Sequence, residues 1–151
     1  MAKSYTTLKA AIITKLTALL GADSGTLFSA VYGVAETQPA GYPFAYVLER
    51  AGKGQILDTA RNEREWQFSI VIHQNIVEGI TPEQAYVFLL DAVDRVITLF
   101  DQDPQLKDSD QEAQCKYVRV LPLEFDYANQ ETAVHRSLLV VACVDTVNRF
   151  A

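Results

Sequence analysis

The chain has 151 residues, 49% of them hydrophobic, and a formal net charge of −6 at pH 7. This length corresponds to one ordinary domain, and the hydrophobic content is sufficient for a core of normal size. The acidic balance argues against a surface that binds nucleic-acid phosphates, because such a surface needs clustered lysine and arginine. The sequence therefore predicts a single domain over residues 1–151 without a phosphate-binding face.

The cysteines and the N-terminus indicate the compartment. Cys115 and Cys143 lie in predicted strands without a nearby Cys or His at metal-ligand spacing, so we expect small buried residues in a reducing compartment. The first residues lead into an amphipathic helix, and we expect no signal peptide. No apolar run approaches the roughly 20 residues that a membrane span requires. We expect a soluble protein, made in a cytoplasm, that does not contact a membrane.

The first third of the chain predicts one helix and two strands. Ser4 or Thr6 can cap a helix that runs to about Leu20, where Gly21 is a natural stop. Its apolar residues at spacings of three and four share one face, which must pack on other elements. Strands are predicted over residues 27–34 and 42–49, and Pro43 suits a strand start or an edge because proline donates no ladder hydrogen bond.

Residues 64–74 give the clearest strand pattern in the chain. Apolar side chains alternate there with mainly polar ones, which is typical of a half-buried strand. The apolar set is Trp66, Phe68, Ile70 and Ile72, and the opposite set is Gln67, Ser69, Val71 and His73. We expect the apolar set to lie in the core.

The best-marked helix begins at Thr81. Thr81 as N-cap, Pro82 at the first helical position and Gln84 completing a capping box predict a helix to about Leu99. Its apolar stripe should be the main cover of the sheet. The stripe consists of Ala85, Phe88, Leu89, Ala92, Val93, Val96, Ile97 and Phe100.

The last part of the chain predicts two strands, over residues 117–127 and 132–147. Pro122 indicates a bulge or bend in the first of them. Residues 138–144 of the second are apolar on both faces, as expected for an interior strand. The predicted fold class is α+β: a mainly antiparallel or mixed five-stranded sheet covered by two helices. The order is α-β-β-β-α-β-β, with a long hairpin between the second and third strands.

Two polar segments are candidates for function. Residues 50–63 contain Gly52 and Gly54 and are too many for a tight turn, and loops of this length tend to be functional or mobile. The segment is either the ragged end of a long hairpin or an arm that reaches a neighbouring subunit, with Ile56 and Leu57 as apolar anchors. Residues 101–114 are acidic and are either a solvated, flexible loop or a functional surface.

The residue pattern shows no catalytic or metal-binding constellation. His73 and His135 are not placed beside a nucleophile or an orienting carboxylate, and we expect both to be surface or subunit-contact residues. Gly52 and Gly54 lack the third glycine of a dinucleotide-binding loop. The acidic segment lacks the alternating ligands and central glycine of a Ca²⁺ loop. We therefore expect no enzyme activity, no cofactor and no metal.

The order of elements carries a family resemblance. It consists of the helix with Leu8-Lys9-Ala10-Ala11-Ile12, the strand Tyr42-Pro43-Phe44-Ala45-Tyr46-Val47, a long polar hairpin, Glu65-Trp66-Gln67-Phe68-Ser69-Ile70-Val71-Ile72, the helix capped by Thr81, and two closing strands. Over residues 6–147 this order resembles the tail terminator (tail completion) proteins of long-tailed bacteriophages, the group of the lambda minor tail protein U. It is also similar to the related neck proteins that join head to tail.

The resemblance implies a ring of six copies at the head-proximal end of the virion tail. In that family the ring caps the tail tube, stops its polymerisation and offers a surface to the head connector, although such proteins can be monomeric in isolation. DNA passes through the ring without specific binding. The resemblance brings no catalytic or cofactor residues, and the expected partners are other copies of the chain, the tail-tube protein and the head-connector protein.

Two residue-level hypotheses follow for such a ring. Because a basic channel would retard DNA, acidic side chains should line the channel or its rim; these are Asp101, Asp103, Asp108 and Asp110. The arm should contact a neighbouring subunit or the tube through Lys53, Gln55, Ile56, Leu57, Arg61 and Arg64. Two alternatives stay open: another head–tail connector or neck protein of similar fold, and a small bacterial α+β ligand- or peptide-binding domain.

Overall fold

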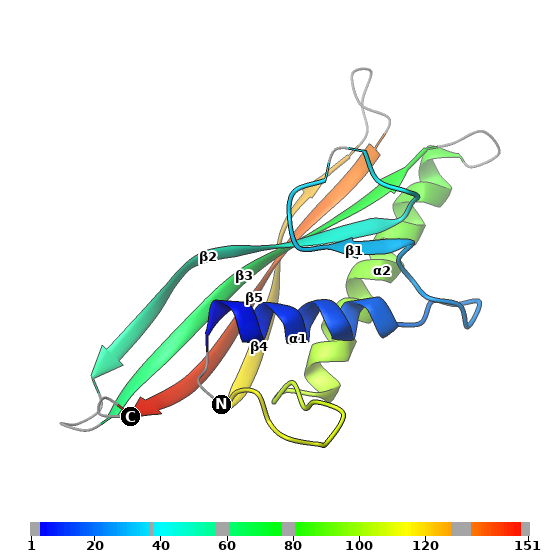
Figure 1. Ribbon diagram of the computed structural model, residues 1–151. Coiled ribbons are helices and arrows are strands. Elements are labelled where there is room, and N and C mark those ends of the chain that lie inside the picture. The colour runs from blue at the N-terminus through cyan, green and yellow to red at the C-terminus, as the bar shows by residue number, and fades with distance from the viewer. Residues whose placement is uncertain (1–3, 37, 57–60, 77–80, 128–133, 149–151) are drawn as a thin grey trace.

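The computed structural model describes residues 4–36, 38–56, 61–76, 81–127 and 134–148. Within these ranges it also describes the side chains, except those of residues 53–56 and 148. In these ranges two helices and five strands follow one another in the predicted order (Figure 1). They are α1 (Tyr5–Ala18), β1 (Ala30–Tyr32), β2 (Phe44–Ile56), β3 (Arg61–Asn75), α2 (Pro82–Gln102), β4 (Tyr117–Asp126) and β5 (Val134–Asn148). The predicted α+β fold class is therefore confirmed.

The five strands form one mixed sheet in the order β1-β2-β3-β5-β4. β1 runs parallel to β2, and the other neighbours pair antiparallel. β5 lies between β3 and β4, which confirms the prediction of an interior strand from its two apolar faces. The register of β4 shifts between Pro122 and Glu124, at the predicted bulge.

Both helix starts follow the predicted capping chemistry. The Ser4 side chain accepts a hydrogen bond from the Thr7 backbone N–H, and the Thr7 side chain accepts one from Ser4 N–H. Thr81 and Gln84 form the same reciprocal pair at α2, where Pro82 occupies the first turn. These caps satisfy backbone donors that have no partner inside the helix. α2 continues to Gln102, three residues beyond the predicted end.

One face of the sheet packs against both helices. The core residues of β2, β3 and β5 alternate along each strand and meet the buried side chains of α1 and α2. Trp66 is 3% exposed, and Phe68, Ile70 and Ile72 are fully buried, as predicted. The helix residues in this core are Leu8, Ile12 and Leu16 of α1 and Leu89, Ala92, Val93, Val96 and Phe100 of α2.

Two sequence-based expectations about this core are wrong. Phe88 is 49% exposed and does not cover the sheet, because the side of α2 that carries Leu89 and Val96 faces the strands and Phe88 lies on its flank. The strand expected over residues 27–34 is only Ala30–Tyr32, paired in parallel with the start of β2. Phe28 contributes to the core from just before that strand.

Candidate functional site

A three-stranded ribbon extends from the helix-covered part of the sheet. We define it as residues 50–56 of β2, 61–65 of β3 and 144–148 of β5. Most of the segment that was expected to be a loop over 50–63 is thus strand: β2 reaches Ile56, β3 begins at Arg61, and β5 pairs with β3 as far as Asn148. The ribbon extends past the start of α1 at the lower left of Figure 1. The interpretation as a long hairpin is correct.

Gly52 allows the ribbon to bend where it leaves the body of the sheet. The register between β2 and β3 shifts between Arg50 and Lys53, which indicates a β-bulge. A Cβ atom at Gly52 would lie 1.9 Å from the Glu65 carbonyl oxygen, so only glycine permits this close approach. The Tyr5 hydroxyl also donates a hydrogen bond of 2.8 Å to the Arg50 carbonyl oxygen. Gly52 therefore shapes the strand, although its sequence position indicated a loop.

The predicted contact residues divide into described and undescribed ones. Arg61 and Arg64 are exposed on β3, and the Arg64 guanidinium carbon lies 6.0 Å from the centroid of the Trp66 ring. Lys53, Gln55 and Ile56 lie on β2, with side chains outside the described set. Leu57 lies outside the described residues. The contact role of all six stays a prediction.

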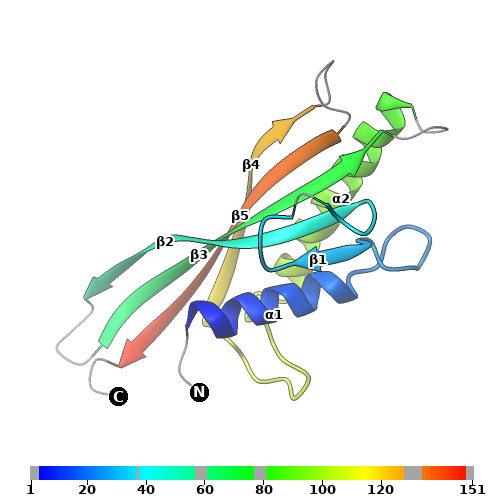
Figure 2. The same ribbon diagram turned by 45° about the horizontal axis from the view of Figure 1, so that its top comes forward.

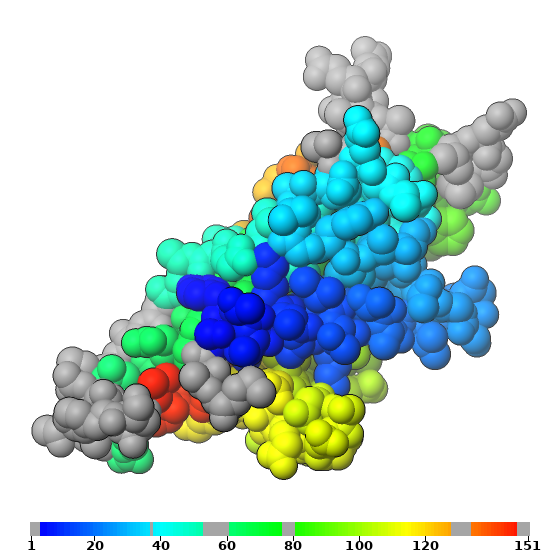
Figure 3. Space-filling model, viewed as in Figure 1, coloured from blue at the N-terminus to red at the C-terminus, as the bar shows by residue number. Residues whose placement is uncertain are grey.

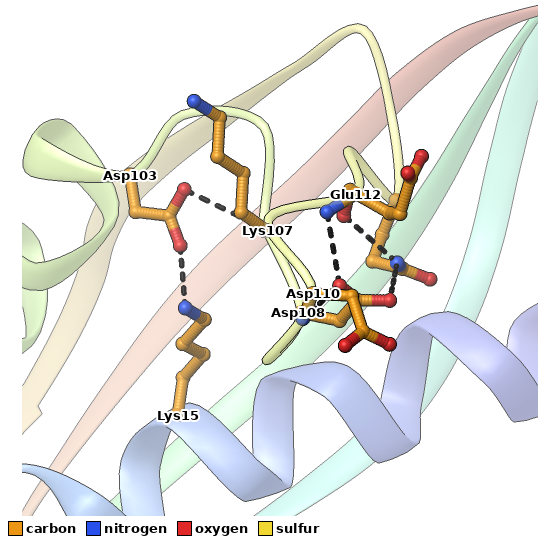
Figure 4. Close-up of polar contacts among 7 residues, drawn as sticks. Lys15, Asp103, Lys107, Asp108, Asp110 and Glu112 are labelled. Carbon is orange, nitrogen blue, oxygen red and sulfur yellow. Dashed lines mark hydrogen bonds and ion pairs between the residues drawn. The ribbon is translucent and has the colours of Figure 1, made fainter.

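The acidic segment after α2 is largely exposed, as expected for a solvated loop, and it has hydrogen bonds of its own (Figure 4). Asp103 caps the helix and pairs with Lys15 of α1, with 2.6 Å between carboxylate oxygen and Nζ. Asp108 Oδ1 accepts hydrogen bonds of 2.9 Å from the backbone N–H groups of Asp110 and Glu112. Leu106, 1% exposed, anchors the loop in the core.

These contacts divide the four aspartates of the channel hypothesis into two pairs. Burial raises the pKa of Asp103, but the hydrogen bonds from Lys15 and the Lys107 backbone N–H, together with the charges of both lysines, outweigh it and lower the pKa overall. Asp103 and Asp108 therefore hold the loop together. Asp101 and Asp110 are exposed. Their position towards a channel stays a prediction.

His135 is buried, which corrects the expectation of a surface residue, whereas His73 is half-buried; a subunit contact of either stays a prediction. His135 is 5% exposed, and its Nε2 lies 3.1 Å from the Pro82 carbonyl oxygen at the start of α2. His73 stacks on Phe44, with ring centroids 4.6 Å apart and an interplanar angle of 2°. Burial, and secondarily the charge of Arg136, lower the pKa of His73 to about 4. His73 is therefore neutral at pH 7 in the folded chain.

The two cysteines are buried, as predicted. Cys143 lies in β5 and Cys115 just before β4, not within a strand as expected. A side-chain hydrogen bond with Cys115, and then burial, raise the pKa of the Cys143 thiol. A thiol with a raised pKa is a poor nucleophile at neutral pH. Among the described residues no group of three or more His, Cys, Asp or Glu side chains could hold a metal ion.

The face of the sheet opposite the helices is largely apolar at its centre. In the register of the strands, Tyr46 and Leu48 of β2, Val71 of β3 and Leu138 and Val140 of β5 share this open face. Neither helix contributes to it. Val71 is 7% exposed and the other four side chains are half-buried, so part of this apolar surface stays accessible to solvent and is a candidate contact surface.

The open face continues to the edge strand β4. Leu121 pairs with Val140 across the sheet and is 61% exposed, and Leu123 beside it at the bulge is 54% exposed. Every residue from Leu121 to Asp126 is exposed, although successive side chains of the strand point to opposite faces of the sheet. An exposed edge strand with large apolar side chains is a template for pairing with another chain.

A groove of about 740 Å³ lies at the end of the molecule opposite the ribbon. It is lined by the loop that follows α1, by the turn before β2, by the end of β3 and by α2. Asp23 of the loop accepts a hydrogen bond of 3.0 Å from the Gly25 backbone N–H, and Asp91 of α2 pairs with Arg95 at 2.8 Å. The exposed Phe88 ring belongs to its wall.

No family model matches the chain, and no curated sequence matches it. None of the helices in the described ranges combines the length and the apolar content needed to cross a bilayer.

Proposed function

We propose that this chain is a structural protein of phage tail assembly: a ring-forming tail terminator that caps the tail tube and presents the head-attachment surface. The observation that carries the proposal is a pair of surfaces that neither described helix covers, namely the apolar open face and the projecting ribbon. Both are suited to contact with proteins and neither is shaped as a reaction site. The element order, with its long hairpin between the second and third strands, supports the same proposal.

The charge of the molecule is compatible with this role. A ring through which DNA passes should not bind phosphates, since each contact adds electrostatic affinity that must be broken. The net charge of −6 and the exposed carboxylates of Asp101 and Asp110 meet this requirement. The expected partners are other copies of this chain, the tail-tube protein and the head connector, and the expected location is the head-proximal end of the tail.

The test is to shorten the ribbon by deleting residues 54–60. We expect a chain that folds but neither assembles nor stops the growth of tail tubes, because the deletion removes the end of the projecting hairpin and spares the core. Circular dichroism checks folding, and electron microscopy of tubes grown from the cognate tail-tube protein measures their length. The control is Gly33→Ala, a small change outside the ribbon. Normal tube length with the shortened ribbon would reject the proposed role of the ribbon.

A second candidate function is a ligand- or peptide-binding domain, because the groove beside Asp23 and Asp91 has the volume of a small-molecule site. Light scattering separates the two. A stable monomer that binds a small ligand, and that does not respond to tube protein, supports the second candidate. Another head–tail connector of similar fold would also form rings, but it would bind the head portal and leave tube length unchanged.

A further inference from the structure

The buried row of side chains on the covered face of β3 ends in a polar residue. Gln74 continues the alternation of Trp66, Phe68, Ile70 and Ile72, and it is 5% exposed. It lies near the end of β3 and belongs to the lining of the groove. Gln74 therefore brings a buried carboxamide to the wall of the groove, at the point where the apolar row stops.

The hydrogen bonds of this carboxamide are incomplete. Its Nε2 donates one hydrogen bond of 3.3 Å, to the carbonyl oxygen of the adjacent residue Asn75. Among the described residues, no donor reaches Gln74 Oε1. Buried side-chain polar atoms ordinarily have a partner, because a buried amide without one costs stability. The Gln74 oxygen and the second N–H of its amide therefore stay available to a bound molecule.

The other polar groups of the lining are mainly acceptors. The Asn75 amide follows Gln74, and the carboxylates of Asp23 and Asp91 come from the loop after α1 and from α2. Asp23 Oδ1 accepts a hydrogen bond within its own turn, and Asp91 Oδ2 accepts one from Arg95, so each carboxylate is held in place and can accept further bonds. None of the described lining residues is Lys, Arg or His. The lining thus disfavours anions, and the pairing with Arg95 balances the charge of Asp91.

Aromatic rings supply apolar walls beside these polar groups. Phe88 is 49% exposed on the flank of α2, and Tyr42 is half-buried in the turn before β2. The Tyr42 ring contacts Phe44 edge to face, with centroids 5.2 Å apart, so its position is fixed by the sheet. In Figures 1 and 2 the loop after α1 and the turn before β2 lie beside the first half of α2, and Figure 3 shows both segments at the surface.

We propose that this groove binds a neutral saccharide. Sugar hydroxyls both donate and accept hydrogen bonds, so they can meet the Gln74 carboxamide and the carboxylates of Asp23 and Asp91 together. The C–H face of a sugar ring is apolar and packs against an aromatic wall such as Phe88. The volume of about 740 Å³ is that of a small-molecule site. The inference gives the second candidate function a ligand class, and it does not depend on the terminator role.

The test is an NMR titration of the isotope-labelled chain with neutral sugars, namely glucose, galactose, N-acetylglucosamine, maltose and lactose. The side-chain amide N–H resonances of Gln74 and Asn75 report directly on the groove. We expect at least one of these sugars to shift both resonances to saturation, together with backbone resonances of residues 21–26. Saturable shifts confined to the groove lining support the inference.

Two variants test the residues that carry the proposal. Gln74→Met removes the carboxamide at similar volume, and Phe88→Ala removes an aromatic wall from an exposed position where folding should not suffer. Each should weaken sugar affinity by about tenfold, the scale of one hydrogen bond or one ring contact. Val87→Ala is the matched control, because Val87 is 53% exposed on the same helix outside the groove lining, and it should leave the affinity unchanged. Circular dichroism checks the fold of all three, and Phe88→Ala decides if Gln74→Met does not fold.

Three results would overturn the inference. The first is the absence of saturable shifts at the Gln74 and Asn75 side chains with every sugar, and the second is unchanged sugar affinity in Phe88→Ala. The third is a groove that responds to spermidine or to inorganic phosphate and to none of the sugars, which would make it a site for ions. Tube length tests the terminator role separately, because the groove and the ribbon lie at opposite ends of the molecule.

Discussion

The two faces of the sheet are built from the same strands but have different surroundings. On β3, Trp66, Phe68, Ile70 and Ile72 meet the helices and are almost completely buried. The alternate residues, from Gln67 to His73, face away from the helices. On β5 the same division separates Leu139 and Val141 from Leu138 and Val140. The covered face thus packs against the helices, whereas neither described helix packs against the apolar centre of the open face.

The comparison shows that apolar content does not by itself mark the core. Both faces of β5 are apolar, yet only one packs against α1 and α2. The covered face stabilises the monomer, since burial of its side chains removes apolar area from water during folding. Side chains on the open face lose further exposed area only when another molecule binds. Substitutions on the two faces should therefore separate folding from assembly.

The largest effect is expected on the covered face, from Trp66→Ala. Trp66 is 3% exposed, and truncating a buried tryptophan removes its contacts and leaves a cavity, which costs about 3–5 kcal/mol of unfolding free energy. Gln67→Ala, one residue further on and on the opposite face, is the matched control and should change stability by about 0.5 kcal/mol or less. Urea unfolding measures both. Equal effects of the two changes would contradict the division into faces.

A smaller effect should appear on the open face as a dependence on pH. The pKa of His73 is about 4 in the folded chain, against an ordinary 6.5, so between these values the unfolded chain binds more protons. The contribution of neutral His73 is complete above pH 6.5 and is lost as the pH falls towards 4, by at most about 3 kcal/mol.

Unfolding free energies between pH 4 and 7.5 measure this loss. Carboxylates also titrate near the lower limit, so the informative quantity is the difference between the wild type and His73→Gln, which cannot titrate. The pH dependence of the variant should be flatter by the amount assigned to His73. Parallel curves for the two proteins would show that the imidazole is as solvated in the folded chain as in the unfolded one.

The smallest effect on stability is expected at the edge of the open face. Leu121 is 61% exposed, so Leu121→Ser should change the unfolding free energy by about 0.5 kcal/mol or less. Loss of self-association or of tube binding in this variant, at unchanged stability, would show that the open face is an interface. A large loss of stability would instead place Leu121 in the folding core.

Sequence patterns predicted the covered part of the fold well because its signals are local. The capping box at Thr81 and the alternation from Trp66 to Ile72 depend on residues a few positions apart, and both are present in the structure. Phe88 was wrongly predicted to cover the sheet, because the apolar stripe of a helix does not reveal how much of the helix surface will pack against the strands. The apolar character of β5 correctly indicated an interior strand, but it did not reveal that one face lacks a helix.

The candidate surfaces were harder to predict because they depend on pairing across long distances in the chain. Gly52 and Gly54 were interpreted as loop residues, whereas the pairing of Glu65 and Lys53 across the hairpin keeps this segment in strand. The groove could not be predicted at all, since Asp23 and Asp91 come together only when the loop after α1 meets α2. The buried position of His135 depends likewise on Pro82, which lies 53 residues earlier.

The central position of β5 has a consequence for the order of events during synthesis. β5 joins β3 to β4, yet it follows all the other described elements in the chain. A nascent chain with β2, β3 and α2 outside the ribosome still has an unpaired inner edge on β3, and β4 has no strand to join. The sheet can close only after β5 emerges, and we expect contacts this distant in sequence to slow folding.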